Sequence, residues 1–114
     1  MTSLSTQQTS AEQPVDHQTE RIERLRQAAY RIRLNALTMG EVQGQGYIGQ
    51  AMGVADVLAV AYTDQLRFRP EDPHWPDRDR FLLSIGHYAI ALYAALAEAG
   101  MIPASASAAY EAMA

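Results

Sequence analysis

The sequence predicts a mostly helical fold with three main helices and one short strand. Apolar residues recur at spacings of three and four across residues 19–39, which is the period of one face of a helix. Residues 52–66 are apolar on nearly every side, and residues 87–99 have helix-forming composition and end at a glycine. The apolar run at residues 80–84, directly before the third helix, has the length of a buried strand.

Composition divides the 114 residues into a tail and a single small domain. The first 17 residues are rich in Ser, Thr and Gln, and their sizeable apolar residues are Met1, Leu4 and Val15. Such a segment buries too little surface to offset its ordering entropy, so residues 1–17 are predicted to be a disordered tail. Residues 18–114 are the predicted folded portion.

Charge and cysteine content exclude several classes of protein. The net charge is −4, and the nine basic residues, all Arg, form no stripe that could neutralise a row of phosphates. Nucleic-acid binding is therefore not expected. The chain has no Cys, which excludes disulfides and cysteine-ligated zinc and fits a reducing compartment. No signal-peptide pattern and no apolar run of about 20 residues is present, so we predict a soluble, cytoplasmic chain without a membrane partner.

The first predicted helix, residues 19–39, has two distinct faces. Thr19 can cap its start, and Glu20 and Glu23 lie favourably near its positive end. The apolar stripe consists of Ile22, Leu25, Ala29, Ile32, Ala36 and Met39. The opposite face carries Arg21, Arg24, Arg31 and Arg33, which are interpreted as solvated.

Five glycines between Gly40 and Gly53 end this helix. Their spacing matches neither the Walker pattern nor a dinucleotide fingerprint, so a flexible connector is favoured over a phosphate-binding loop. The predicted helix at 52–66 follows and is expected to be buried, against this chain or against another one. Its expected apolar face consists of Val54, Val57, Leu58, Ala61 and Tyr62, with Ala55, Ala59 and Val60 nearby.

Residues 67–80 hold three prolines and alternating charges, which is typical of a surface loop. Trp75 within this loop is expected to pack as a lid over the core. The third helix is predicted to stop at Gly100, in the C′ position.

The junction between the predicted strand and the third helix carries the candidate site. The run Ser84-Ile85-Gly86-His87 places His87 in the first helical turn, where free backbone N–H groups and the positive helix dipole suit an anion such as a diphosphate. The imidazole can add a further donor. A lone histidine at a helix start is more often a surface or capping residue, and spacing by itself leaves both interpretations open.

Three stretches, in order, resemble the N-terminal part of the transketolase family, which uses thiamine diphosphate. "GYIGQAMGVAD" (46–56) is similar to the family's Gly-His-Pro-Gly…Gly-x-Ala-Asp segment. "DPHWPDRDRFLLS" (72–84) resembles the Asn/Asp-Pro…Trp…Asp-Arg-Asp-Arg-Phe-x-Leu-Ser segment. "GHYAIALYAALAEAG" (86–100) follows the Gly-His…Leu-Tyr…Leu…Gly pattern.

This resemblance implies that the chain is part of an α/β fold that binds thiamine diphosphate. It also implies an activity, the transfer of a two-carbon ketol unit between sugar phosphates. It implies that His87, with Gly86, contacts the cofactor diphosphate. The family histidine that contacts substrate falls on Tyr47, and the family proline falls on Ile48. Tyrosine donates a hydrogen bond but is a poor acid or base near neutral pH, so no catalytic residue is assigned. The Gly-Asp-Gly…Asn segment that supplies the family's Mg²⁺ ligands is not in this sequence, so no metal ligand is assigned either.

Two kinds of function follow. In the first, the chain is a partial transketolase-like subunit, inactive alone and completed by a homo-oligomer or a complementary transketolase subunit. In the second, it is a non-catalytic interaction module or an inactive truncated remnant.

Overall fold

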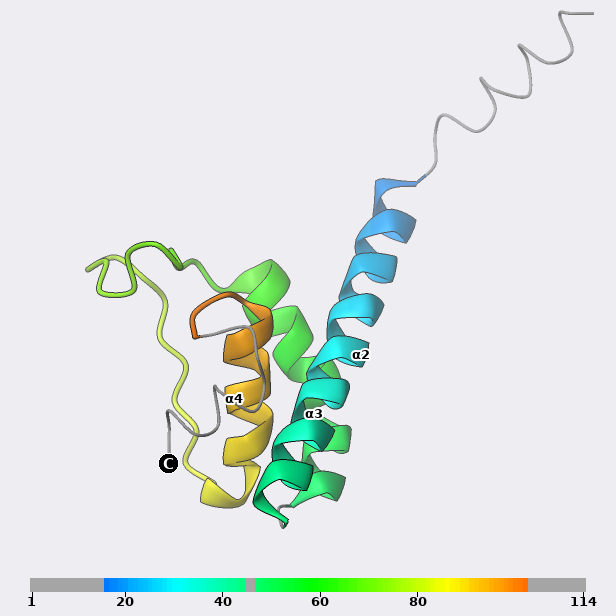
Figure 1. The fold of residues 1–114 in the computed structure, drawn as a ribbon. Coiled ribbons are helices and arrows are strands. Elements are labelled where there is room, and N and C mark those ends of the chain that lie inside the picture. Colours follow the sequence, from blue (N-terminus) through cyan, green and yellow to red (C-terminus); the bar gives the residue numbers. More distant parts are fainter. Residues whose placement is uncertain (1–15, 45–46, 103–114) are drawn as a thin grey trace, which may run out of the picture.

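The computed structural model describes residues 16–44 and 47–102, which form a bundle of three α-helices (Figure 1). A π-helix continues the second α-helix, and one 3₁₀ turn precedes the third. In chain order the elements are α2 (His17–Gln43), α3 (Ile48–Val60), η1 (Ala61–Gln65), η2 (Gly86–Tyr88) and α4 (Ala89–Glu98). The prediction of three main helices is confirmed. The described residues contain no strand, so the parallel sheet of an α/β fold is not among them.

Helix α2 is longer at both ends than the predicted 19–39. It begins at His17 because Asp16 is the N-cap, with its carboxylate accepting a hydrogen bond from the Gln18 N–H at 3.3 Å. The tail prediction is therefore wrong at residues 16 and 17, and residues 1–15 lie outside the described part. The helix runs through Gly40 and ends only where Gly44 adopts φ 72°, a left-handed conformation that suits glycine.

The glycine-rich connector is also shorter than predicted. Helix α3 starts at Ile48, so Gly49 and Gly53 lie inside it. Each helical glycine costs about 1 kcal/mol relative to alanine, yet the helix buries Ala51 and Ala55 completely. Tertiary packing of this face outweighs the local preference of the glycines for a turn.

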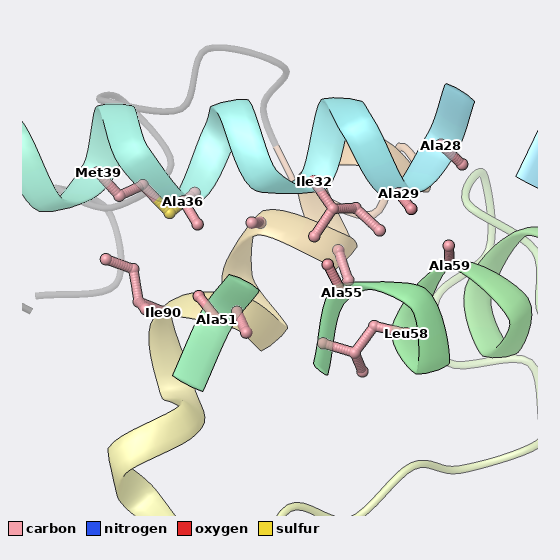
Figure 2. Close-up of a cluster of buried hydrophobic side chains, with 13 residues drawn as sticks. Ala28, Ala29, Ile32, Ala36, Met39, Ala51, Ala55, Leu58, Ala59 and Ile90 are labelled. Atoms are coloured by element: carbon pink, nitrogen blue, oxygen red, sulfur yellow. The ribbon is translucent and has the colours of Figure 1, made fainter. Parts of the chain in front are cut away.

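Small side chains dominate the core between the three helices (Figure 2). Alanine lets helix backbones approach closely, and Ile32 and Met39 are the largest side chains that are fully buried. The predicted stripe on α2 is confirmed for Ala29, Ile32, Ala36 and Met39. It fails at Ile22, which is 41% exposed, because the N-terminal part of α2 extends past the other helices (Figure 1).

The predicted apolar face of the second helix is partly wrong. Val57 and Val60 are exposed. The face that packs against α2 and α4 is instead formed by Ala51, Ala55, Leu58 and Ala59. These residues follow the three-to-four spacing of a helix, and so do Val57 and Val60. Because both faces are apolar, the hydrophobic pattern does not indicate which one is buried.

Three of the four arginines assigned to a solvated face of α2 instead join it to other elements. Arg21 Nε donates to Asp64 Oδ1 in η1 at 3.0 Å, and Arg31 Nε donates to Glu98 Oε2 in α4 at 2.7 Å. Arg33 Nη2 lies 2.9 Å from Asp56 Oδ2 and 3.0 Å from the Met52 carbonyl, both in α3. Because these acceptors are distant in sequence, the arginine pattern by itself could not indicate them.

Residues 66–85 connect η1 to η2 as turns and extended chain. The surface-loop prediction for 67–80 is confirmed, but Trp75 is not a lid over the core: it is half-buried, with the Arg69 guanidinium 4.0 Å from its ring centre. The strand prediction for 80–84 is wrong. A strand needs a hydrogen-bonded neighbour, and no backbone hydrogen bond joins residues 80–84 to the rest of the described chain.

The predicted end of the third helix is confirmed. Gly100 has φ 81°, its N–H donates to the Ala97 carbonyl at 3.2 Å, and the Met101 N–H donates to the Leu96 carbonyl at 2.9 Å. This pair of bonds is a Schellman motif. None of the described helices is long and apolar enough to span a membrane.

Candidate functional site

Tyr47 lies at the N-terminus of α3, three residues after Gly44, the C-cap of α2. It is the N-cap residue, and its side chain makes no capping hydrogen bond. Its carbonyl accepts the first intrahelical bond, from the Ala51 N–H at 3.2 Å. The N–H groups of the first turn of α3 therefore have no partner within the helix or from a side-chain cap. Tyr47 as a whole residue is 53% exposed.

His87 lies at the corresponding end of α4. It is the middle residue of the 3₁₀ turn η2, which follows the extended Ile85 and leads directly into α4. No side chain caps this turn either. His87 and Gly86 are both exposed, and a side chain added at Gly86 would meet no atom within 4 Å. The backbone at this junction is thus open to a ligand.

The fold brings Tyr47 and His87 together across forty residues of sequence. Their ring centres are 4.6 Å apart with the planes inclined at 56°. This contact joins the N-terminal ends of α3 and α4, whose backbone N–H groups carry partial positive charge. An imidazole, a phenol and two uncapped helix starts are all able to donate hydrogen bonds, so this end of the bundle suits an anionic group.

The same end of the molecule fits a diphosphate better than a metal ion. Among the described residues, no three His, Cys, Asp or Glu side chains lie close enough together to hold a metal. The donors around Tyr47 and His87 are N–H and O–H groups, which bind phosphate oxygens rather than a hard cation. Among the described residues, Gly86, His87 and the start of α3 present donors at this end that could contact an anionic group.

Asp79 anchors the loop that precedes this site, and the sequence patterns did not indicate that role. Its carboxylate accepts from the Arg67 backbone N–H at 2.8 Å and from the Arg67 guanidinium, while its own N–H donates to the Arg67 carbonyl at 2.7 Å. Hydrogen bonds from Arg67 hold the pKa of Asp79 below its usual range. This clamp fixes the start of the extended segment that leads to Gly86. The repeated Asp-Arg pattern was its only signal in the sequence.

Other concave surfaces lie away from this pair. A groove of about 600 Å³ beside the first half of α2 is lined by Glu20, Glu23, Arg24, Leu25, Gln27, Ala28, Arg31 and Thr63. A smaller hollow includes Tyr62. The centre of its ring lies 5.8 Å from the ring centres of Phe68 and Phe81. Burial raises the pKa of the Tyr62 hydroxyl. Neither hollow includes Tyr47 or His87.

Comparison with known proteins identifies clear relatives. The sequence model of the family described as "Transketolase, thiamine diphosphate binding domain" matches residues 25–105. An uncharacterized transketolase family protein of Sinorhizobium fredii is 71% identical over 79 residues, which are 69% of this chain and 28% of that protein. Transketolase 2 of Xanthobacter flavus is 48% identical over 65 residues, 55% of this chain and 10% of that protein.

A third relative carries the word subunit in its name. The 6-deoxy-6-sulfo-D-fructose transketolase subunit of a Clostridium species is 42% identical over 72 residues, 61% of this chain and 26% of that protein. The matched part of the chain therefore spans between 10% and 28% of the length of these relatives.

Proposed function

The chain belongs to the transketolase family through its match to the thiamine diphosphate binding domain, and on that premise we propose that it is a partial transketolase-like subunit whose Tyr47–His87 end contacts the diphosphate of the cofactor. Completed by further polypeptide, the assembly would transfer a two-carbon ketol unit between sugar phosphates. Thiamine diphosphate supplies the carbon centre that accepts this unit. The residues of this chain bind and orient the diphosphate.

The observation that carries the proposal is the contact between the Tyr47 and His87 rings at 4.6 Å. It brings two helix N-termini without side-chain caps to one exposed location. A phosphate group there would accept hydrogen bonds from backbone N–H groups and from the His87 imidazole, with the positive ends of both helix dipoles favouring its charge. Tyr47, whose ring contacts that of His87, would face the substrate side of the cofactor.

A complete cofactor site would need residues in addition to those at the Tyr47–His87 end. The sequence holds no Gly-Asp-Gly segment for the expected Mg²⁺ ligands. The extended residues 80–85 also expose apolar side chains, with Leu82 at 90% and Ile85 at 52%. In a completed domain this segment would pair with a strand of the added polypeptide. The chain by itself is expected to catalyse no ketol transfer above a no-protein blank.

The phosphate contact is testable on the isolated chain. Inorganic pyrophosphate is titrated into the protein while the histidine ring signals are followed by NMR. We expect saturable shifts at His87, and His87→Ala should weaken binding by about 5- to 150-fold, the equivalent of about 1–3 kcal/mol for a hydrogen bond to a charged group. His74→Ala is the matched control, because His74 is also exposed but lies in the surface loop.

Two results would contradict the proposal. The first is that pyrophosphate shifts the His74 and His87 signals equally. The second is that His87→Ala binds pyrophosphate as the wild type does. Loss of helical circular dichroism in His87→Ala would in turn assign the ring a structural role.

A non-catalytic interaction module is the second candidate. The exposed apolar segment around Leu82 favours it, because such a segment serves a partner strand whether or not a cofactor is bound. A chain that binds a complementary transketolase subunit but gives no pyrophosphate response would support this alternative.

A further inference from the structure

The smaller hollow, of about 270 Å³, is formed by segments that are distant in sequence. Tyr62 comes from the π-helix η1, and Leu96 comes from the end of α4. Phe68, Arg80 and Phe81 come from the chain that connects η1 to η2. Pockets that bind small molecules are typically concave and mostly apolar, with a small number of polar groups that orient the ligand. This hollow has both features.

Three aromatic rings line the hollow. The ring centre of Tyr62 lies 5.8 Å from that of Phe68, with the ring planes inclined at 62°. It also lies 5.8 Å from the ring centre of Phe81, with the planes inclined at 53°. Inclined rings at this separation bring the positive edge of one ring toward the negative face of another, which is a favourable arrangement. A further aromatic ring in the hollow can join this cluster in the same way, whereas an aliphatic ring gains burial alone.

Two polar side chains of the hollow have no polar partner. No hydrogen bond or ion pair joins the exposed Arg80 or the half-buried Tyr62 to another residue in the described part of the chain. The other charged side chains that line the hollow, Arg78 and Asp79, form hydrogen bonds with residues of the same loop. Burial raises the pKa of the Tyr62 hydroxyl, so this group remains a protonated donor at neutral pH. One free cation and one free neutral donor suit an anionic group.

The backbone at Tyr62 gives an independent indication of a binding role. Tyr62 lies in the π-helix that follows α3, where the Leu66 N–H donates to the Ala61 carbonyl at 2.8 Å, five residues back along the chain. Such segments are rare in proteins, and they occur frequently at functional sites. The widened turn ends α3 and leads directly into the chain that carries Phe68.

We propose that this hollow binds a small aromatic carboxylate. Its ring packs against Tyr62, Phe68 and Phe81, and its carboxylate accepts hydrogen bonds from the Arg80 guanidinium and the Tyr62 hydroxyl. The planar guanidinium matches the two oxygens of a carboxylate. The volume of about 270 Å³ lies just below the roughly 300–1,000 Å³ of pockets for drug-sized ligands, so a molecule with a single ring fits. Because the hollow does not include Tyr47 or His87, the proposal stands whether or not that end of the bundle binds a diphosphate.

The test is a titration of the full chain with benzoate, followed by the backbone amide signals in NMR. We expect saturable shifts at the residues that line the hollow, with a Kd on the order of 0.1–1 mM for a ligand of this size. Cyclohexanecarboxylate carries the same charge without an aromatic ring, and benzyl alcohol carries the ring without a charge. Each should bind at least about fivefold more weakly than benzoate.

Two conservative variants test the polar contacts. Arg80→Gln should weaken benzoate binding about tenfold and leave benzyl alcohol binding unchanged, because only benzoate carries the charge that Arg80 recognises. Tyr62→Phe keeps the ring and removes the hydroxyl, so it should weaken benzoate binding about fivefold. Arg26→Gln is the matched control: Arg26 is also exposed and has no ion pair in the described chain, but it does not line the hollow. Circular dichroism of each variant should match the wild type.

Four outcomes would overturn the proposal. The first is that benzoate causes no saturable shifts. The second is that cyclohexanecarboxylate binds as tightly as benzoate, which would indicate a general attraction of anions. The third is that Arg80→Gln and Arg26→Gln have the same effect on benzoate binding. The fourth is that the shifts occur at His87 while those of residues 80–82 stay unchanged, which would place benzoate at the other end of the connecting chain.

Discussion

Replacing Ile32 with alanine tests whether the core between the helices holds the chain together. Ile32 is completely buried, at 0% exposed, in the middle of α2, where it packs within the alanine-rich core (Figure 2). Truncating a buried isoleucine to alanine costs about 2–5 kcal/mol, through lost apolar transfer energy and the cavity that remains. The small alanines around it have little side chain with which to fill that cavity, so we expect the upper half of this range.

Ile22 provides a control of the same residue type on the same helix. It is 41% exposed, so Ile22→Ala removes apolar surface that is already partly in water and leaves no enclosed cavity. Its expected cost is about 1 kcal/mol or less. The two substitutions change helix propensity equally, so the difference between them measures burial.

The assay is urea unfolding followed by far-UV circular dichroism. A folded unit of this size has a total stability on the order of 5–10 kcal/mol, so Ile32→Ala could leave the chain largely unfolded. In that case Ile32→Val, with an expected loss of about 0.5–1.5 kcal/mol, gives the measurable value. Equal losses in the free energy of unfolding for Ile22→Ala and Ile32→Ala would refute the packing of α2 in this structure.

Two further predictions concern pH and the glycines. The Arg21 guanidinium lowers the pKa of Asp64 from 3.8 to about 2, so this ion pair contributes stability above about pH 4 that is lost as the pH falls toward 2. Urea unfolding of the wild type should thus show a loss of stability at acid pH that Asp64→Asn lacks. Parallel pH profiles of the two proteins would contradict a stabilising ion pair between Arg21 and Asp64. Gly53→Ala, inside α3 with open space around the added methyl group, should raise stability by about 0.5–1 kcal/mol. Gly100→Ala should lower it by about 1 kcal/mol because φ is 81° there, and an equal effect of both substitutions in the same unfolding assay would contradict this assignment.

The sequence by itself determined the parts of this protein that depend on local chemistry. The periodicity of residues 19–39 and the glycine at 100 indicated a first helix and the end of the third, because helix faces and left-handed caps are encoded by neighbouring residues. The short motifs around Tyr47 and His87 indicated the transketolase family, because each motif consists of residues that are neighbours in the sequence. Helix ends were less accurate, because Asp16 and Thr19 are both good caps and only the fold selects between them.

The tertiary structure decided everything that depends on residues distant in sequence. It selected the alanine face of α3 over its valine face, because only the partner helices determine which apolar side is covered. It paired Arg21, Arg31 and Arg33 with carboxylates in three other elements, which no local pattern indicated. It left residues 80–84 without a strand partner in the described chain, since a strand exists only with its neighbour. It also brought Tyr47 against His87, because three packed helices place two helix starts at the same end of the bundle.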